Sequence, residues 1–392
     1  MAMSKNPEQR VAIFSLAYLP FVGGAELAIK EIAARLPYQF ICFTRLFDSH
    51  WPNKEIMGSV TVSRSGSGGG GYYGHPWKKA WYVFQAWRAA EAEHRRQPFS
   101  AVWAMMAAYA GIAALLFKWC HPSVPLLLTL QEGDSEAHIL RRVGIWYPFW
   151  KQLFRKADRI QVISTYLAEF ARRHGARCPI EVVPNGVDLK NFEISAAGQR
   201  IKLAQADDIK VIITTSRLVP KNGIDVLIRA VAELKNTAPA QRLKLMILGE
   251  GPEQEKLKKL AGDLGVGRET EFVGHVDPAG VGRYLFLSDV FVRPSRSEGL
   301  GSSFLEAMAA GVPIIGTAVG GIPDFLKHGE TGLVVKVDDP KDLTQKIKQI
   351  LADGGLRQRL ANNGARLVRE RYTWESVAHK MRQLFSQLII NY

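Results

Sequence analysis

Two glutamates, Glu298 and Glu306, stand eight residues apart in the segment EGLGSSFLE, which is rich in glycine and serine. An ionised carboxylate only accepts hydrogen bonds, and it can hold two sugar hydroxyl groups at once. Residues 299–302 between them lie where an expected strand, 289–292, gives way to an expected helix. Unpaired N–H groups and the positive helix end meet there, which suits a diphosphate. These features together indicate a site for a nucleotide sugar.

One member of the pair also has a structural explanation. Ser303 followed three residues later by Glu306 is the spacing of a capping box, and Gly311 with Pro313 would end the same helix. Glu298 has no comparable structural role, and the glycines beside it cost conformational entropy without packing anything. The pair therefore favours binding, with a helix cap as the alternative for Glu306.

Two further segments follow expected strands and suit the same kind of ligand. Arg217 and Lys221 come directly after strand 211–215, where two cations could neutralise a diphosphate. Gly23 and Gly24 come after the first strand and would let the backbone approach a ligand closely, with helix N–H groups behind them. A solvated lysine and a tight packing turn are the structural alternatives.

The composition describes a globular chain of two domains. At 392 residues, 47% hydrophobic and 22% charged, the chain can form two cores of ordinary size. Its three cysteines are scattered without a C-x-x-C spacing, which predicts neither a disulfide nor a zinc site and fits the cytoplasm. The net charge of +14 is spread along the chain without a basic tail. That distribution disfavours nucleic acid as a partner and suits anionic small molecules or an anionic membrane surface.

No transmembrane helix is expected. Residues 11–22 are apolar and follow two cations, as in a signal peptide, but Pro20 interrupts the run and a buried strand is expected instead. Residues 101–117 carry no charge, yet this stretch is short for a span and divides into a strand and a helix. The glycine-rich residues 66–71 lack the Lys-Ser/Thr of a phosphate loop, so a surface loop is expected there.

Short apolar runs alternate with helical patterns along the whole chain, which is typical of parallel strands covered by helices on both faces. The expected strands are 11–16, 40–44, 101–105, 126–130, 159–163 and 180–183, then 211–215, 244–248, 270–273, 290–292, 313–316 and 332–334. This order predicts an α/β chain with two Rossmann-like, doubly wound domains. Ligands of such sheets bind at the carboxyl ends of strands, so an interdomain cleft is expected to hold the site.

The expected domains are residues 1–190 and 209–372, joined by a polar linker at 191–208. The turn signal Asn185-Gly186 marks the approach to that join. Residues 373–392 form a last helix with an apolar stripe, and packing toward the first domain would bury this stripe.

The motifs resemble glycosyltransferase family 4, whose members are retaining enzymes of the GT-B fold. The resemblance rests on E-G-x-G-x(4)-E, on E-A-M-A-x-G-x-P at 306–313, on G-G-I-P at 320–323 and on G-E-T-G-L-V at 329–334. It extends over nearly the whole chain, and the combined motif is highly specific. It implies an acceptor-side first domain and a second domain that binds the nucleotide sugar.

The resemblance also implies roles for single residues. Glu298 would hold hydroxyl groups of the donor sugar and Glu306 the ribose, while Arg217 and Lys221 would neutralise the leaving diphosphate. Lys221 stands one place earlier than in the usual family pattern R-L-V-x-E-K-G. Backbone amides of the intervening loop would contact the sugar and the diphosphate, namely those of Gly299, Leu300, Gly301 and Ser302.

Other positions follow from the same resemblance. Val276 would lie along the base through its backbone, and Gly23 and Gly24 would face the diphosphate from the first domain. Gln131 stands where the family often has a histidine. Because an amide can donate a hydrogen bond but cannot act as an acid or a base, Gln131 is expected only to position the acceptor or the sugar. Its neighbour Glu132 is expected to take part in the same positioning.

The implied chemistry needs few protein groups. The leaving diphosphate would itself take the proton of the acceptor, while cations and helix amides stabilise its growing charge. Domain closure would keep water out. No cofactor and no bound metal are implied, and the sequence has no Asp-x-Asp motif that would hold a metal.

Residues 75–88, HPWKKAWYVFQAWR, form an expected helix in which Trp77, Trp81, Phe84 and Arg88 share one face. Aromatic residues beside cations are the composition of a helix that lies on an anionic membrane surface. The alternative, which we favour slightly, is that the tryptophans pack on the sheet. At a membrane, the acceptor would be lipid-linked.

We therefore expect a cytoplasmic or peripherally membrane-bound hexosyltransferase. It would move sugar from a UDP- or GDP-sugar to a saccharide or lipid-linked acceptor in cell-envelope polysaccharide or glycolipid synthesis. Alternatives are a sugar-nucleotide epimerase, a non-catalytic nucleotide-sugar-binding protein and a nicotinamide dehydrogenase. The dehydrogenase is disfavoured because Gly23-Gly24 lacks the G-x-G-x-x-G pattern and because Arg45 stands where an acid would bind the ribose.

Overall fold

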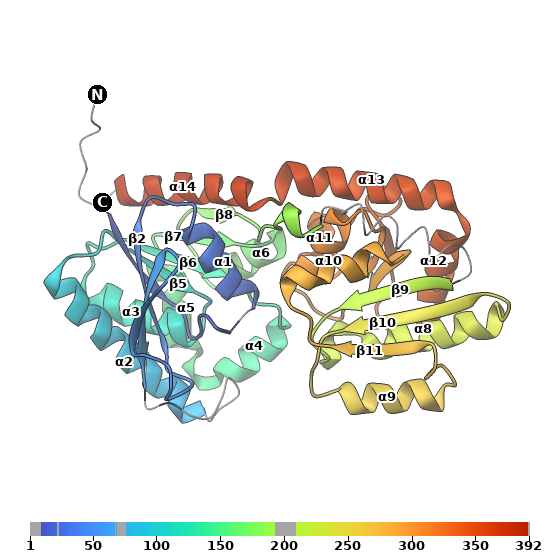
Figure 1. Cartoon of the computed structure of the whole chain (residues 1–392). Coiled ribbons are helices and arrows are strands. Elements are labelled where there is room, and N and C mark those ends of the chain that lie inside the picture. Colours follow the sequence, from blue (N-terminus) through green and yellow to red (C-terminus); the bar gives the residue numbers. More distant parts are fainter. Residues whose placement is uncertain (1–8, 22, 67, 69–75, 193–208, 391–392) are drawn as a thin grey trace. The chain divides into compact units, whose positions relative to one another are not determined.

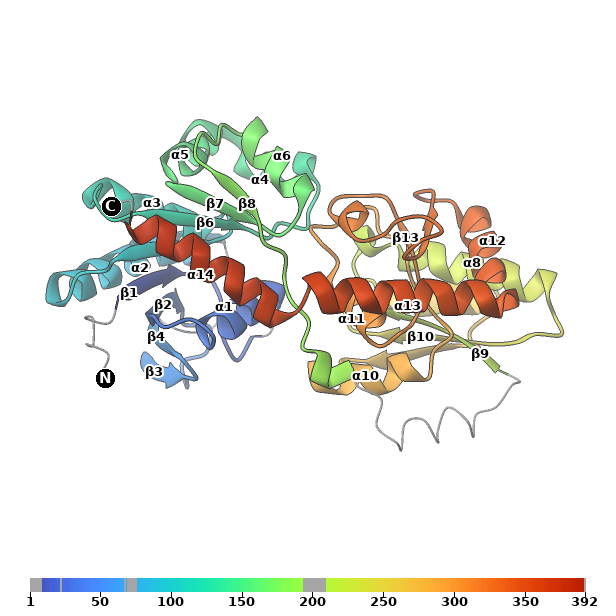
Figure 2. The same cartoon turned by 90° about the horizontal axis from the view of Figure 1, so that it is seen from above.

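The computed structural model describes residues 9–21, 23–66, 68, 76–192 and 209–390, and it is shown in Figures 1 and 2. The chain divides into two compact α/β units. The first unit is Met1–Asn185 with Trp374–Tyr392, and the second is Gly186–Thr373. The division falls a few residues before the expected domain end at 190, and most of the expected linker, 191–208, lies outside the described residues.

An eight-stranded sheet forms the centre of the first unit, in the order β3-β4-β2-β1-β5-β6-β7-β8. Neighbouring strands run parallel except β3, which is antiparallel to β4. The strands are β1 (Arg10–Phe14), β2 (Gln39–Arg45), β3 (Lys54–Met57), β4 (Val60–Ser65), β5 (Ala101–Met105), β6 (Leu126–Leu130), β7 (Arg159–Val162) and β8 (Ile180–Val182).

The hairpin of β3 and β4 was not expected from the sequence. In β4 the side chains of Val60, Val62 and Arg64 are buried and alternate with partly exposed polar ones. Such alternation marks a strand with one covered face, whereas the expected strands were identified as continuous apolar runs. The sheet of the first unit is therefore mixed at one edge, where Ile56 of β3 is 77% exposed.

Helices cover both faces of this sheet. The helices of the first unit are α1 (Gly24–Ala33), α2 (Pro76–Arg96), α3 (Tyr109–Cys120), α4 (Glu136–Val143), the 3-10 helix η1 (Gly144–Trp146), α5 (Tyr147–Lys156), α6 (Thr165–Arg173) and α14 (Trp374–Ile390). In Figures 1 and 2, α14 lies beside α1 on one face, and α2 and α3 pack together on the other.

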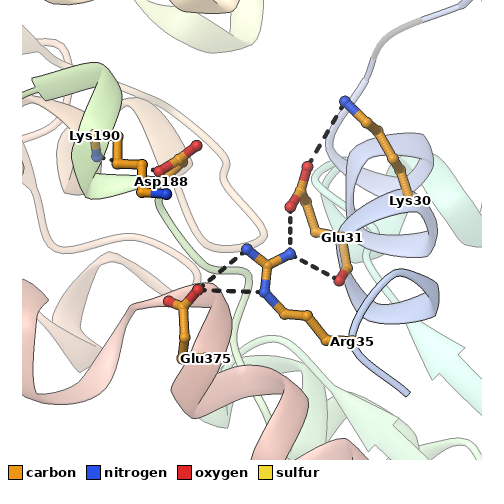
Figure 3. A network of polar contacts seen from close by, with 6 residues as sticks. All are labelled: Lys30, Glu31, Arg35, Asp188, Lys190 and Glu375. Carbon is orange, nitrogen blue, oxygen red and sulfur yellow. Dashed lines mark hydrogen bonds and ion pairs between the residues drawn. The ribbon is translucent and has the colours of Figure 1, made fainter. Parts of the chain in front are cut away.

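The last helix, α14, supplies part of the core of the first unit. Its apolar stripe is buried against β1, β2, β5 and α1. The ring of Phe385 lies 5.5 Å from that of Trp103 and 6.2 Å from that of Phe40. At the surface, Arg35 of the α1 segment donates to Glu31 and to Glu375, which Figure 3 shows. The apolar stripe of α14 thus packs on the first unit.

The second unit has a six-stranded parallel sheet in the order β11-β10-β9-β12-β13-β14. Its strands are β9 (Ile209–Thr215), β10 (Arg242–Leu248), β11 (Thr270–Gly274), β12 (Val290–Arg293), β13 (Ile314–Thr317) and β14 (Leu333–Val335). Its helices are α8 (Ile224–Thr237), α9 (Gln254–Asp263), α10 (Pro278–Phe286), α11 (Ser302–Ala309), α12 (Pro340–Ala352) and α13 (Gly354–Arg371), with the 3-10 turns η2 (Leu189–Phe192), η3 (Pro220–Asn222) and η4 (Ile322–Asp324).

Helices α8, α9 and α12 cover one face of this sheet, and α10, α11 and α13 cover the other (Figure 1). The central strand β9 pairs with β10 on one side and with β12 on the other, so the strand order reverses at β9. Ligands of open parallel sheets bind at the carboxyl ends of strands where the order reverses. The segments after β9 and β12 are therefore the expected place for a site. All twelve strands expected from the sequence occur, with ends within two residues.

Replacing Phe385 by alanine is expected to lower the free energy of unfolding by about 3–5 kcal/mol, because the cavity would lie among the rings of α14 and the sheet. Ile390→Ala is the matched control, since Ile390 lies on the same helix and is 80% exposed. That control should change the stability by less than about 0.5 kcal/mol. Urea denaturation followed by circular dichroism measures both, and equal midpoints for the two variants would contradict the packing of α14.

Candidate active site

The loop between β12 and α11 carries Glu298, whose side chain is 15% exposed. Its Oε2 atom pairs with the guanidinium of Arg293, the last residue of β12. Its Oε1 atom accepts a hydrogen bond from the backbone N–H of Gly299 at 3.3 Å. Both oxygens therefore have fixed partners, while each keeps lone-pair capacity for a further donor. The carboxylate is held in one orientation at the carboxyl edge of the sheet.

Arg296 ties the same loop to two neighbouring segments. Its guanidinium donates two hydrogen bonds to Asp225, at 2.9 and 2.8 Å, and one to Asp338 at 2.6 Å. These carboxylates raise the pKa of Arg296 and keep it charged. Its backbone N–H donates to the carbonyl of Lys221 at 2.7 Å. Because of this contact, the turn that carries Lys221 and the loop that carries Glu298 are connected directly.

Two glycines allow backbone segments to meet at this edge. A Cβ atom on Gly320 would lie 1.7 Å from the carbonyl oxygen of Glu298, and one on Gly223 would lie 2.0 Å from that of Pro294. Both glycines also adopt positive φ, 55° and 70°. No other residue fits there without moving the loop. The Gly320-Gly321 turn noted in the sequence therefore packs directly against the backbone of Glu298.

The capping box expected at Ser303 and Glu306 does not form. Gly301, with φ of 93°, is the N-cap residue of α11 and makes no side-chain cap hydrogen bond. The hydroxyl of Ser303 instead accepts a hydrogen bond from Arg293 Nη1 at 2.6 Å. The helix begins at Ser302, so Ser303 lies inside it instead of at the N-cap. The N-cap position is held by Gly301, which has no side chain to accept from the first N–H groups of α11. Glu306 has no capping function.

Glu306 lies one turn into α11 and keeps part of its surface accessible. Burial raises the pKa of its carboxyl from 4.5 to about 7, and the positive charge of Arg293 lowers it only in part. The two glutamates of the motif therefore differ, since one is paired with an arginine and burial raises the pKa of the other. Gly299, Leu300, Gly301 and Ser302 form the connection between them.

Arg217 and Lys221 follow β9, next to β12 in the sheet. The side chain of Arg217 is exposed, and that of Lys221 is half-buried. Asn222, which departs from the family pattern, donates from Nδ2 to the carbonyl of Arg217 at 2.7 Å and so fixes the turn. The structure thus brings the predicted cations to the same sheet edge as Glu298.

Val276 follows β11, which is separated from β12 by two strands. It lines a hollow of about 470 Å³ together with Val273, His275, Arg283 and Tyr284. The backbone N–H of His275 donates to Glu250 at 3.3 Å. This hollow is the part of the second unit where the base was expected.

The predicted residues of the first unit form a second group. Gly23 and Gly24 are exposed at the start of α1, where the N-cap residue, Gly23, has no side chain to cap the helix. Gln131 and Asn185 exchange two amide hydrogen bonds, of 3.2 and 3.0 Å, and a Cβ atom on Gly24 would lie 3.5 Å from Asn185. Asn185 was noted in the sequence only as a turn signal, and its contact with Gln131 was missed.

Glu132 lies beneath this group and is 8% exposed. Its Oε1 atom accepts from the N–H of Ala107 at 2.7 Å, while the buried Oε2 atom has no hydrogen-bond partner among the described residues. Burial raises the pKa of Glu132 to about 7, although backbone N–H groups, that of Ala107 foremost, oppose the rise. The indole N–H of Trp150 donates a hydrogen bond to the carbonyl oxygen of Ala107 at 2.6 Å and so fixes this residue. A protonated Glu132 could donate a hydrogen bond at the carboxyl end of β6.

The aromatic side chains of α2 do not all pack on the sheet, which corrects the favoured expectation. Trp81 and Phe84 are 61% and 39% exposed, and it is Tyr82 that is buried and donates to Ser15 and Phe43 carbonyls. Trp77 lies in a part of α2 whose side chains are not described. No helix in the described part of the chain is long and apolar enough to cross a bilayer.

Two family profiles match the chain in succession. Residues 22–191 match the profile described as "Glycosyltransferase Family 4", and residues 197–367 match "Glycosyl transferases group 1". The chain is 33% identical over 272 residues to a lipopolysaccharide core biosynthesis glycosyltransferase of Rhizobium meliloti, which covers 69% of this chain and 75% of that protein.

Other relatives match over a shorter part. The chain is 31% identical to a GDP-mannose-dependent alpha-(1-6)-phosphatidylinositol monomannoside mannosyltransferase of Mycobacterium tuberculosis, over 62% of this chain. The match spans 63% of the length of that relative.

The fold is shared with solved structures. Sucrose-phosphate synthase of Thermosynechococcus elongatus superimposes with a TM-score of 0.84 at 23% identity, over 98% of this chain and all of that one. An Anabaena protein solved in complex with UDP-glucose gives 0.77 at 19% identity, over 97% and 100%. The fold class predicted from the sequence, two parallel-sheet α/β domains of the GT-B type, is confirmed.

Glu306→Gln is expected to stabilise the protein at pH 8 but not below pH 4.5. The folded-state pKa of about 7 lies above the ordinary 4.5, so stability falls as pH rises between these values and stays reduced above them. The variant avoids this loss, which amounts to about 1–3 kcal/mol. Denaturation at pH 4.5 and pH 8 measures the difference in the free energy of unfolding between the variant and the parent. Glu132 titrates in both proteins, so its contribution to the pH dependence drops out of this difference. An equal gain at both pH values would contradict the raised pKa.

Proposed function

The chain belongs to glycosyltransferase family 4, and we propose that it moves a hexose-type sugar, with retention of anomeric configuration, from a nucleoside diphosphate sugar to a saccharide or lipid-linked acceptor. The observation that supports this best is the grouping of Glu298, Arg293 and Glu306 around the uncapped start of α11. It combines acceptors for hydroxyl groups with N–H donors for a diphosphate at one sheet edge.

In the proposed complex, Glu298 accepts hydrogen bonds from hydroxyl groups of the donor sugar, and Glu306 accepts them from the ribose. Backbone amides of residues 299–302 donate to the diphosphate, which Arg217 and Lys221 neutralise. The base occupies the hollow beside Val276. Gly23, Gly24 and Gln131 belong to the first unit and would contact the donor from there.

The proposed reaction breaks the bond between the sugar C1 and the diphosphate oxygen, and the acceptor oxygen forms its bond to C1 on the same face. The departing diphosphate takes the proton of the acceptor hydroxyl. Fixed cations and helix amides stabilise the negative charge that develops on the leaving group, so no protein carboxylate needs to act as the base. The proposed reaction uses no bound metal, and transfer should persist in excess EDTA.

The donor is proposed to be a UDP- or a GDP-sugar. The relative from Mycobacterium tuberculosis is GDP-mannose-dependent, and the Anabaena structure contains UDP-glucose, so both bases occur among similar proteins. A ligand that binds only the folded state raises the melting temperature. Thermal shifts with UDP, GDP and ADP therefore identify the base before any acceptor is known.

Glu298→Gln is expected to lower the rate of sugar transfer by about 100-fold or more, because a fixed polar contact to the reacting sugar is weakened. The assay is release of nucleoside diphosphate from the donor that gives the largest thermal shift, with and without a lipid-linked or saccharide acceptor. Glu255→Gln is the control, since this glutamate is 84% exposed on α9. Transfer at the parental rate in Glu298→Gln would remove the main residue assignment.

We further propose that α2 binds an anionic membrane surface on which a lipid-linked acceptor lies. Trp81 and Phe84 are exposed side by side with ring centroids 5.6 Å apart, and the guanidinium of Arg88 lies 5.7 Å from the ring of Phe84. Burial lowers the pKa of nearby Lys79, as do the positive charges of Arg142 and Arg45. An arginine beside exposed aromatic rings suits anionic lipid.

Changing Trp81 and Phe84 together to serine is expected to reduce binding to vesicles containing phosphatidylglycerol by about tenfold, since apolar area no longer enters the interface. Co-sedimentation at low and high salt measures this. Ile56→Ser is the control, because Ile56 is 77% exposed on β3 and lies outside the cluster. Undiminished binding of the double variant would exclude α2 as the membrane surface.

A further inference from the structure

Arg293 is a charged side chain buried at the centre of the candidate site, with 6% of its surface exposed. Its Nε atom donates to Ser295 Oγ at 3.2 Å, and Nη1 donates to Ser303 Oγ at 2.6 Å and to the Thr215 carbonyl at 3.3 Å. Its Nη2 atom pairs with Glu298. The partners come from three separate segments, namely β9, the loop after β12 and α11.

A buried guanidinium costs a large desolvation energy unless its donors are satisfied, and its planar fork fixes the positions of the groups that satisfy them. Arg293 therefore sets the place of Glu298 relative to α11. Glu306 belongs to the same helix, and the charge of Arg293 also acts on its carboxyl. One cation thus lies within reach of both carboxylates, whose negative charges would otherwise oppose each other.

The packing around Arg293 leaves it no alternative position. Its guanidinium lies 5.0 Å from the ring centroid of Phe304, in cation–π geometry. A Cβ atom on Gly301 would come within 3.4 Å of Nη2 and 2.9 Å of the Phe304 ring. The glycine before α11 therefore leaves room for the arginine as well as for the turn.

We infer that Arg293 is a positioning residue for sugar transfer, holding the Glu298 carboxylate where the hydroxyl groups of the donor sugar would meet it. This inference rests on the proposed function of the site. Because Arg293 contacts Glu298 directly, its loss should affect the sugar part of the donor more than the nucleotide part. A merely structural arginine would affect both parts equally, through stability alone.

The test compares Arg293→Met and Arg293→Lys with Arg10→Met. Arg10 is a close match because it is 3% exposed, pairs with Glu93 at 2.7 Å and lies 5.0 Å from the ring centroid of Phe99. It begins β1, at the opposite end of that strand from Gly23. The measurements are kcat, KM for the donor, and Kd for the nucleoside diphosphate that gives the largest thermal shift.

Arg293→Met should lower kcat by about 30-fold or more while the Kd of the nucleoside diphosphate changes less than about threefold. Arg293→Lys keeps the charge without the fork, so it should recover only part of kcat. Arg10→Met should lose stability and keep kcat. Parental kcat in Arg293→Met, or equal losses for sugar and nucleotide, would overturn the inference.

The double variant Arg293→Met/Glu298→Gln tests whether Arg293 and Glu298 act through one shared interaction or independently. If Arg293 acts through Glu298, the double variant should be within about threefold of Glu298→Gln alone, because the two changes remove one interaction. Multiplied losses would show that the two residues act independently and would contradict the inference.

Failure of the proposed function would look different. A parent protein that binds the donor but transfers no sugar would disprove the transferase. The inference would then be tested by the ratio of donor affinity to nucleoside diphosphate affinity, which Arg293→Met should lower about tenfold. An unchanged ratio would refute it.

Discussion

A parallel strand can pair with the next only after the chain has crossed back to the starting end of the sheet, and helices make these crossings. Apart from the β3–β4 hairpin, both units obey this constraint, so their helices cover both sheet faces and the loops after the parallel strands gather at one edge. Every candidate residue lies in such a loop or at the start of the helix that follows. Where two loops touch, as at Gly320 and Glu298, only glycine leaves enough space.

The candidate residues at these sheet edges differ in charge between the two units. In the second unit, arginines hold carboxylates in place, as Arg293 does for Glu298 and Arg296 for Asp225. In the first unit the groups carry less charge, because Gln131 pairs with another amide and burial raises the pKa of Glu132 to about 7, so that its carboxyl is only partly ionised at neutral pH. A charged edge suits a diphosphate sugar, whereas a less charged one suits hydroxyl groups without attracting ions.

The sequence predicted the buried strands well, because a strand covered on both faces needs a continuous apolar run. The sequence did not predict the features that depend on contacts between segments far apart in the chain. The β3–β4 hairpin has only an alternating pattern, and Ser303, expected as a cap, lies inside α11 and accepts a hydrogen bond from Arg293 of the preceding strand. An arginine at the end of a strand looks like a surface residue until its partners are known. The exposure of Trp81 likewise depended on which face of α2 met the sheet.

Helix α14 completes the core of the first unit although it is encoded after the whole second unit. During synthesis on the ribosome, the apolar face of β1, β2 and β5 therefore stays uncovered until the second unit, about two hundred residues, and then α14 have been made. During that time the nascent first unit exposes a surface that invites aggregation or a chaperone. A chain truncated before residue 374 would leave this surface uncovered permanently. The exposed apolar face of the first unit would then mark incomplete copies for quality control in the cell.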